Sequence, residues 1–290
     1  MIPERPILGR SRACTIRLSE PEISGEHALL RWIGGWELQD LHSRNGTFVD
    51  GRRLAAGERI SLAPGAEIGF GRVDGYILTD GGPPEAFAAP LEEGAAVAAQ
   101  SDLLALPDPA NPLVTIYRVG DAWSIEQGGE VQAIADGATI QIAGGGWRVH
   151  LPEALPQTRD IETAPLTVGA LTLRFCVSRD EEYVELLALH GGRVFDLKAR
   201  AHHYPLLLLA RARLGDVGLP TDQQGWVHQD ELLRQLRSDA NRLHIDVYRI
   251  RRQLAELGIA DAARIVERRP GTRQLRIGAA RLEIVPLARG

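Results

Sequence analysis

Several residue types are scarce in this chain, and each shortage excludes a class of protein. The 290 residues include only 2 cysteines, Cys14 and Cys176, which are too few for a disulfide framework. No apolar stretch approaches the roughly 20 residues that a membrane-spanning helix needs, and the N-terminus lacks the apolar core of a secretion signal. We therefore expect reduced thiols in a cytoplasmic protein without a membrane segment.

Lysine is scarcer still, because Lys198 is the only one and arginine carries almost all of the positive charge. Residues 1–190 contain 15 Lys+Arg and 27 Asp+Glu, a balance of −12. Residues 191–290 contain 18 and 11, a balance of +7, which leaves the formal net charge of −5. Such asymmetry between the two parts indicates that one end of the chain meets a polyanion.

Catalytic and metal-binding patterns are also missing. Ser24 and His27 suggest a hydrolase pair, but no Gly-x-Ser-x-Gly elbow or third triad member accompanies them. The histidines at 190, 202 and 203 have no partners at metal-ligand spacing, and neither a P-loop nor Gly-x-Gly-x-x-Gly occurs. We expect no enzymatic activity, no metal and no cofactor.

Three short polar motifs occur near the N-terminus: Gly9-Arg10, Ser24-Gly25-Glu26-His27, and residues 43–51 with Asn45-Gly46 and Asp50-Gly51. Alternating segments such as 15–18 and 36–39 lie between them and predict half-buried strands. Asn-Gly and Asp-Gly favour tight turns, so the polar residues are expected at loop tips. A guanidinium, a hydroxyl and a carboxamide there are suited to a phosphate group and the peptide that carries it.

The order and spacing of these motifs over residues 7–78 resemble the forkhead-associated (FHA) domain, a β-sandwich that binds phosphothreonine peptides. The resemblance implies that Arg10 and Ser24 contact phosphate, that Asn45 contacts the peptide main chain, and that His27 supports the loop from within. Arg44 is a further candidate for the phosphate site. The implied partner is a threonine-phosphorylated protein, either a Ser/Thr kinase or its substrate.

Two departures from the FHA pattern stand out. Gly25 occupies the position after the serine, where the family commonly has a basic residue; Arg44 or Arg12 can offset that loss. The family also has a strand before the Gly-Arg motif, but only eight residues precede Gly9. Either the start of the chain is truncated or a later strand fills the vacant sheet edge.

The middle of the chain is interpreted as two linkers with an additional β segment between them. Residues 81–112 are rich in Ala, Pro and acidic residues and are interpreted as a linker between the FHA domain, 1–80, and an additional β segment, 113–152. Residues 137–151 echo residues 65–78, so the segment is either a degenerate second sandwich or the strands that complete the first. A second Pro-rich linker is expected at 153–170.

The last segment, 171–290, predicts strands followed by three helices at about 206–214, 230–236 and 240–257. Ser238 and Asp239 are candidate N-caps of the third helix and Gly258 closes it. Its apolar stripe comprises Leu243, Val247, Ile250, Leu254 and Leu257, which places Ile245, Tyr248, Arg249 and Arg252 on the far side. A hairpin with a basic tip follows at 264–277.

This order resembles the OmpR/PhoB-type winged helix-turn-helix, whose third helix enters the DNA major groove while its hairpin wing touches the backbone or the minor groove. The fold expected for the whole chain is multidomain: an all-β sandwich, an additional β segment and an α+β winged helix. The resemblance implies duplex DNA as a partner, with contacts from Arg242, Tyr248, Arg249, Arg252, Arg268, Arg269 and Arg273. The competing interpretation of these arginines is a solvated helix face.

Three hypotheses follow. The first is a transcriptional regulator that reads threonine phosphorylation and binds DNA. The second is a phosphopeptide-dependent scaffold whose winged helix contacts protein instead. The third is an accessory subunit of an enzyme. Oligomeric state, homo-oligomers included, is left open.

Overall fold

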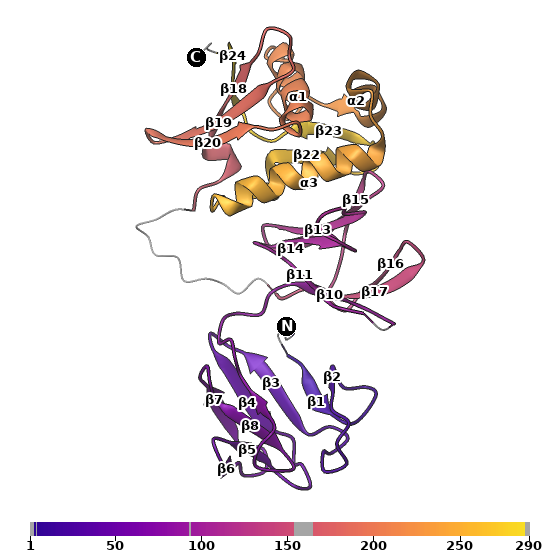
Figure 1. Ribbon diagram of the computed structural model, residues 1–290, viewed down its shortest axis with the longest axis vertical. Coiled ribbons are helices and arrows are strands. Elements are labelled where there is room, and N and C mark those ends of the chain that lie inside the picture. Colours follow the sequence, from indigo (N-terminus) through magenta and orange to yellow (C-terminus); the bar gives the residue numbers. More distant parts are fainter. Residues whose placement is uncertain (1–2, 4, 93, 154–164, 288–290) are drawn as a thin grey trace. The chain divides into compact units, whose positions relative to one another are not determined.

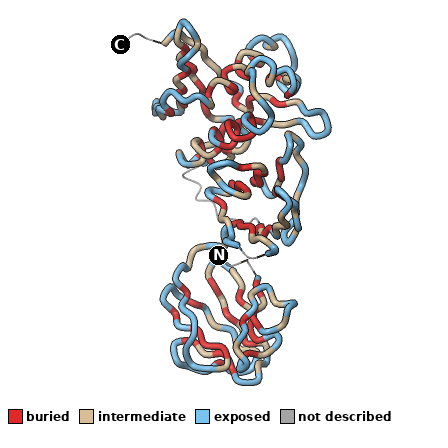
Figure 2. Tube along the Cα trace, turned by 45° about the vertical axis from the view of Figure 1, so that its right-hand side comes forward, coloured by how far each residue is buried: buried red, intermediate tan, exposed pale blue. Residues whose placement is uncertain are grey.

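Figure 1 shows the computed structural model, which describes residues 3, 5–92, 94–153 and 165–287. The chain divides into two compact units, one formed by residues 1–86 with 151–153 and the other by residues 87–150 with 154–290. Each contains its own buried segments, drawn red in Figure 2, beneath exposed loops. None of the described helices is long and apolar enough to cross a membrane, and both cysteines are half-buried free thiols.

The first unit is a sandwich of two sheets. One sheet has the strand order β2-β1-β3-β4-β7 and the other β6-β5-β8-β9. Their bounds are β1 Ile7–Gly9, β2 Ile16–Arg17, β3 Ala28–Trp32, β4 Trp36–Asp40, β5 Thr47–Val49, β6 Arg52–Arg53, β7 Arg59–Leu62, β8 Glu67–Phe70 and β9 Tyr76–Ile77. Alternate residues of β4 are buried, as expected for a strand with one face on a core. The all-β sandwich was therefore predicted correctly.

The sheet edge at β9 bears on the strand that was expected before the Gly-Arg motif. This strand pairs with β8, and no other described strand lies on its outer side; Ile77 is 60% exposed there. None of the later described strands joins either sheet, so the alternative that a later strand fills the vacant sheet edge is wrong for the described residues. The chain after β9 instead folds back on β4, where the Trp36 indole nitrogen donates to the Gly82 carbonyl at 3.0 Å.

Residues 87–150 form two further four-stranded sheets, in the orders β11-β10-β17-β16 and β12-β13-β14-β15. The bounds are β10 Phe87–Pro90, β11 Val97–Ala98, β12 Leu103–Leu106, β13 Val114–Val119, β14 Ala122–Gln127, β15 Glu130–Ala133, β16 Thr139–Ile142 and β17 Gly145–His150. Because β10, β11 and β12 lie within 81–112, the linker interpretation of that segment is wrong. Its apolar residues are core: all four residues of β12 are buried.

The echo between residues 65–78 and 137–151 corresponds to a repeated hairpin. Gly65 donates its amide to the Leu78 carbonyl at 2.7 Å, and Gly137 donates to Val149 at 3.0 Å. In both hairpins the partner donates back to the alanine that follows the glycine. None of the strands in 87–150 pairs with β1–β9, so this segment does not complete the first sandwich.

The rest of the second unit is α+β. It contains a sheet of order β20-β19-β18-β24, a smaller sheet of order β21-β23-β22 and three helices. The bounds are η1 Val168–Ala170, β18 Thr172–Val177, β19 Val184–His190, β20 Arg193–Ala199, α1 His203–Gly215, β21 Val227–His228, α2 Gln229–Leu236, α3 Ala240–Glu256, η2 Ala262–Ile265, β22 Val266–Arg269, β23 Gln274–Ile277 and β24 Arg281–Pro286. The expected linker 153–170 lies largely outside the described residues, but Val168 near its end is 1% exposed and belongs to the core.

Helix α3 follows the sequence-based expectation closely. The Asp239 carboxylate accepts the Arg242 amide at 2.8 Å, as an N-cap does. Gly258, with φ +79°, follows its C-terminus. The residues of the predicted stripe from Leu243 to Leu254 are buried in the main core. The apolar period therefore located the helix and its inner face.

Candidate functional site

Three loops of the first unit meet at Ser24. From the β1–β2 loop, the Arg10 amide donates to the Ser24 carbonyl at 2.9 Å, and its Nε donates to the Ile23 carbonyl at 3.3 Å. From the β4–β5 loop, the Arg44 amide donates to the Ser24 hydroxyl at 3.0 Å. The Asn45 carboxamide donates to the Glu22 carbonyl at 2.7 Å. The structure thus brings together all four residues that the sequence singled out for this site.

Gly9 permits the closest approach between two of these loops. A Cβ atom at this position would lie 2.3 Å from the Gly25 carbonyl oxygen, which also accepts the Ser11 amide at 2.9 Å. Any side chain here would push the Ser24 loop away from Arg10. The glycine of the Gly-Arg motif is therefore a backbone requirement of the site.

His27 joins two loops from beneath. The ring is fully buried; its Nδ1 accepts the Ser24 amide at 3.0 Å, so the neutral ring carries its proton on Nε2 and donates it to the Gly46 carbonyl at 3.1 Å. Burial lowers the pKa of His27, although the bond to Gly46 opposes this. The histidine remains a fixed, neutral bridge between the serine loop and the asparagine loop.

A buried carboxylate, which the sequence analysis did not single out, shapes the asparagine loop. Asp40 Oδ1 accepts the Ser43 hydroxyl at 2.6 Å and the Thr47 hydroxyl at 2.7 Å, and Ser43 in turn accepts the Gly46 amide at 3.1 Å. Burial favours a raised pKa, but the Ser43 and Thr47 hydrogen bonds outweigh it and lower the pKa of Asp40. The Asp-x-x-Ser spacing typical of side-chain-capped turns was the available signal.

The outward groups of the site are hydrogen-bond donors, and the arginines among them are cationic. Arg10, Arg44 and Asn45 are exposed, and none of the described ion pairs of this unit involves either arginine. The Ser24 hydroxyl accepts from Arg44 and keeps its own hydrogen for a ligand. Exposed Arg53, which the motifs did not mark, lies over Gly46, where a Cβ atom would meet its Nε at 2.3 Å. Guanidiniums and a hydroxyl arranged in this way suit a doubly charged phosphate.

The FHA family model matches residues 7–71. Residues 7–71 are an FHA domain. The FHA domain of FhaA, solved in complex with an intracellular domain, is 32% identical with a TM-score of 0.23, over 24% of this chain and 76% of that one. Mycobacterium tuberculosis EmbR, solved with a low-affinity phosphopeptide, is 26% identical with a TM-score of 0.22, over 23% of this chain and 17% of that one.

The N-terminal FHA domain of S. cerevisiae Rad53p, solved with a phosphothreonine peptide, is 28% identical with a TM-score of 0.21, over 22% of this chain and 53% of that one. No curated protein matches the chain. Neither the family match nor these structures identify a winged helix at residues 171–290.

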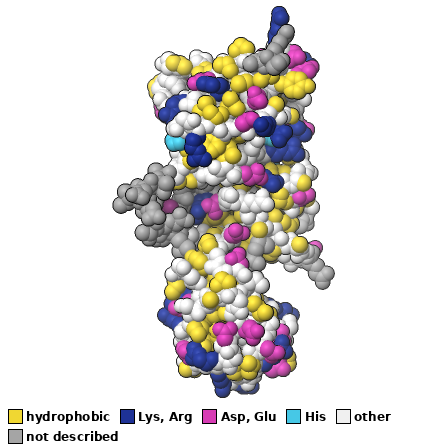
Figure 3. Space-filling view, turned by 60° about the vertical axis from the view of Figure 1, so that its left-hand side comes forward, with side chains coloured by type: hydrophobic (Ala, Val, Ile, Leu, Met, Phe, Trp, Pro, Cys, Tyr) yellow, Lys and Arg dark blue, Asp and Glu magenta, His cyan; other side chains and the backbone are white. Residues whose placement is uncertain are grey.

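The seven residues expected to contact DNA are not equivalent in the second unit. Arg249 is exposed on α3. Arg242 and Arg252 on the same helix pair with Asp246 at 3.3 Å and with Glu256 at 2.9 Å. At the hairpin, the Arg269 guanidinium lies 4.3 Å from the centre of the Trp226 ring, and Arg273 lies 3.7 Å from Asp230. On the face drawn in Figure 3, basic side chains stand in separate groups with acidic ones between them.

Two of the seven residues are covered. Tyr248 is 3% exposed and packs with Leu103, Ala105 and Tyr117 of β12 and β13, and the Arg268 side chain is 3% exposed against Glu126 of β14. Ile245, at 9%, is also buried. The expectation that Ile245 and Tyr248 project into solvent is wrong, because helical periodicity identifies the face opposite the core but not a second sheet packed on the helix flank.

Proposed function

We propose that the FHA domain binds a phosphothreonine peptide of a partner protein, a Ser/Thr kinase or its substrate. Arg10 and Ser24 hold the phosphate, Asn45 hydrogen-bonds the peptide main chain, and Arg44 adds charge. The observation that supports this most is the convergence of these four residues on one loop junction above His27. The Rad53p structure contains a phosphothreonine peptide and the EmbR structure a phosphopeptide. The proposal involves no catalytic step.

The proposal is tested by titrating the whole protein with one peptide in three forms: phosphothreonine, phosphoserine and unphosphorylated threonine. Each charge-assisted hydrogen bond contributes about 1.5–3 kcal/mol, so losing at least two of them should weaken binding about a hundredfold or more. We expect the phosphothreonine form to bind and the unphosphorylated form to fail. Equal affinity for the phosphorylated and unphosphorylated peptides would disprove the assignment.

A second function, DNA binding by the second unit, is favoured by its order of strands, three helices and a hairpin, and by exposed Arg249 with Arg242 beside it. We propose that this part is a winged helix that presents α3 and the β22–β23 hairpin to duplex DNA, which would make the chain a phosphorylation-reading regulator. The alternative is a scaffold in which α3 contacts protein; the buried position of Tyr248 against β12 and β13 favours that alternative.

Salt dependence separates the two alternatives. Each neutralised phosphate should lower the logarithm of the affinity by about 0.9 per logarithmic unit of salt. Five of the expected arginines remain uncovered, namely Arg242, Arg249, Arg252, Arg269 and Arg273. We expect a steep slope in the wild type and a slope shallower by about two units in the Arg249→Ala/Arg252→Ala variant. Arg193→Ala on β20 is the control, which should bind like the wild type. A flat salt response would favour the scaffold.

A further inference from the structure

Glu126 of β14 is a fully buried carboxylate that links distant elements of the second unit. Its Oε2 accepts from Arg251 Nη1 of α3 at 2.7 Å, and its Oε1 accepts from Arg268 Nε of β22 at 2.7 Å. His244 Nδ1 of α3 lies 3.5 Å from Oε1. We call these four residues the Glu126 cluster. One carboxylate is thus the shared counter-ion of two buried guanidiniums.

The two arginines differ in how many of their other hydrogen bonds depend on the sheet β12–β15. Arg251 donates to the carbonyls of Ala263 and Val266, both at 3.0 Å. These two hydrogen bonds do not involve the sheet β12–β15. Arg268 donates to Gln229 at 2.8 Å and at 3.3 Å to the Gly129 carbonyl, which belongs to the β14–β15 turn. Without the sheet β12–β15, Arg268 would keep its hydrogen bond to Gln229 but would lose the carboxylate of Glu126.

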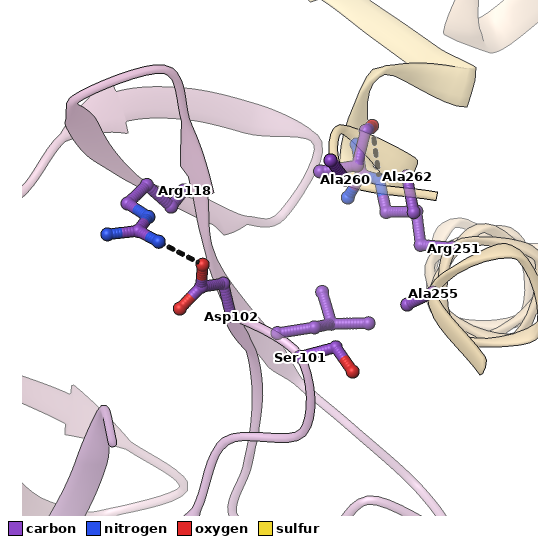
Figure 4. A pocket seen from close by; sticks show the side chains of 9 residues that line it. Ser101, Asp102, Arg118, Arg251, Ala255, Ala260 and Ala262 are labelled. Atoms are coloured by element: carbon purple, nitrogen blue, oxygen red, sulfur yellow. Dashed lines mark hydrogen bonds and ion pairs between the residues drawn. The ribbon is translucent and has the colours of Figure 1, made fainter. Parts of the chain in front are cut away.

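The apolar part of this contact is small. Tyr248 and Ala263 meet Leu103, Ala105 and Tyr117 in a cluster of their own, separate from the main core of the unit. Next to it lies a cavity of about 10 Å³, room for about one water molecule. Figure 4 shows Arg251 reaching from α3 toward η2 on one side of this cavity, with Asp102 and Arg118 paired on the other. The contact therefore combines a small apolar cluster with the buried charges of the Glu126 cluster.

The two parts of the second unit that meet at this contact have opposite net charge. Residues 87–150 contain 8 Asp+Glu and 2 Lys+Arg, whereas residues 165–290 contain 15 and 20. An acidic sheet on a basic helix and hairpin offers carboxylate oxygens where a nucleic acid would offer phosphate oxygens. The sheet also covers Tyr248 and Arg268, which belong to the surface that the proposed function assigns to DNA.

We propose that the sheet β12–β15 competes intramolecularly with duplex DNA for the flank of α3 and for β22, and that the Glu126 cluster holds the sheet in place. This inference rests on the proposed DNA binding. Removing the charge of Glu126 leaves two buried guanidiniums without their counter-ion, which disfavours the docked sheet. DNA then gains access to Arg268 and to the Tyr248 flank.

The test compares Glu126→Gln with Glu130→Gln in the full chain. Glu130 is exposed on β15 of the same sheet, so its replacement removes the same charge without touching the cluster. Binding of a mixed-sequence DNA duplex is measured at one salt concentration by fluorescence anisotropy. We expect Glu126→Gln to bind roughly 5- to 150-fold more tightly than the wild type, the range of typical coupling between sites, and Glu130→Gln to bind like the wild type.

Hydrogen exchange of β12–β14 provides a readout independent of DNA, and it should increase in Glu126→Gln only. If Glu126→Gln does not fold, Thr115→Val takes its place. It removes the milder contact between Thr115 and His244, at 3.0 Å, and should tighten DNA binding in the same direction. DNA binding with equal affinity in the wild type and the cluster variants would overturn the competition alone. No DNA binding by any protein, with exchange increased in the variant, would instead overturn the proposed DNA binding.

Discussion

Replacing Arg10 by alanine is expected to weaken phosphothreonine-peptide binding more than tenfold. The Arg10 side chain is exposed and is positioned by the Ile23 carbonyl, which directly precedes Ser24. Each charged hydrogen bond lost costs about 1.5–3 kcal/mol, and every 1.4 kcal/mol is a factor of ten. The measurement is a peptide titration by calorimetry or fluorescence anisotropy.

Two further variants make the result specific. Arg59→Ala removes the same charge from β7, where the side chain is exposed on another strand of the same unit, and should leave affinity almost unchanged. Arg10→Lys keeps the charge but loses the planar fork, so its affinity should be intermediate. Because the Arg10 side chain is exposed, the thermal unfolding transition of Arg10→Ala should equal that of the wild type. Wild-type affinity in Arg10→Ala would remove the arginine from the site.

Lowering the pH from 7 to 4 is expected to destabilise the second unit by about 3 kcal/mol through His203 alone. The ring is buried in α1, with its Nε2 2.9 Å from the Gln253 carboxamide oxygen. Burial, with a smaller contribution from neighbouring His202, lowers the pKa of His203 from 6.5 to about 4, although the Gln253 hydrogen bond opposes it. The folded state therefore keeps this histidine neutral where the unfolded chain already binds a proton.

The sign follows from the depressed pKa. Stability is fully present above pH 6.5, is lost at about 1.4 kcal/mol per pH unit as the pH falls, and stops falling near pH 4, where the folded state also binds the proton. His203→Gln should lower stability at pH 7 because a buried hydrogen bond changes, but its pH dependence between 6.5 and 5 should be flatter. Exposed His190→Gln is the control.

Urea unfolding at pH 7, 6 and 5, followed by hydrogen exchange in α1, measures the difference between wild type and variant. The difference should shrink steadily toward pH 5, because only the wild type loses the contribution of His203. Parallel pH dependences for the wild type and His203→Gln would show that this histidine is not held neutral in the folded protein.

Local chemistry allowed part of this architecture to be predicted from the residues alone. Asn45-Gly46 predicted a turn because few residues tolerate positive φ, and Gly46 has φ +91°. Asp239 and Gly258 bounded α3 because caps satisfy groups within one helical turn. The spacing of Gly9, Ser24 and Asn45 indicated the FHA domain because a phosphate site needs specific donors at specific loop tips. Such signals extend over a few residues, so one sequence suffices to recognise them.

Burial and pairing over long distances were decided only by the tertiary structure. Alanine and proline in residues 81–112 were interpreted as a linker, but the buried residues of β12 pair with β13 and meet Tyr248 of α3. Arg268 was expected to contact DNA from the hairpin wing. Nothing near it in the sequence indicated that Glu126, 142 residues away, would pair with it. The charge of a side chain and its place in the apolar period predict which face of a helix or strand it occupies. The residue that it contacts there depends on which distant strand the fold brings to that face.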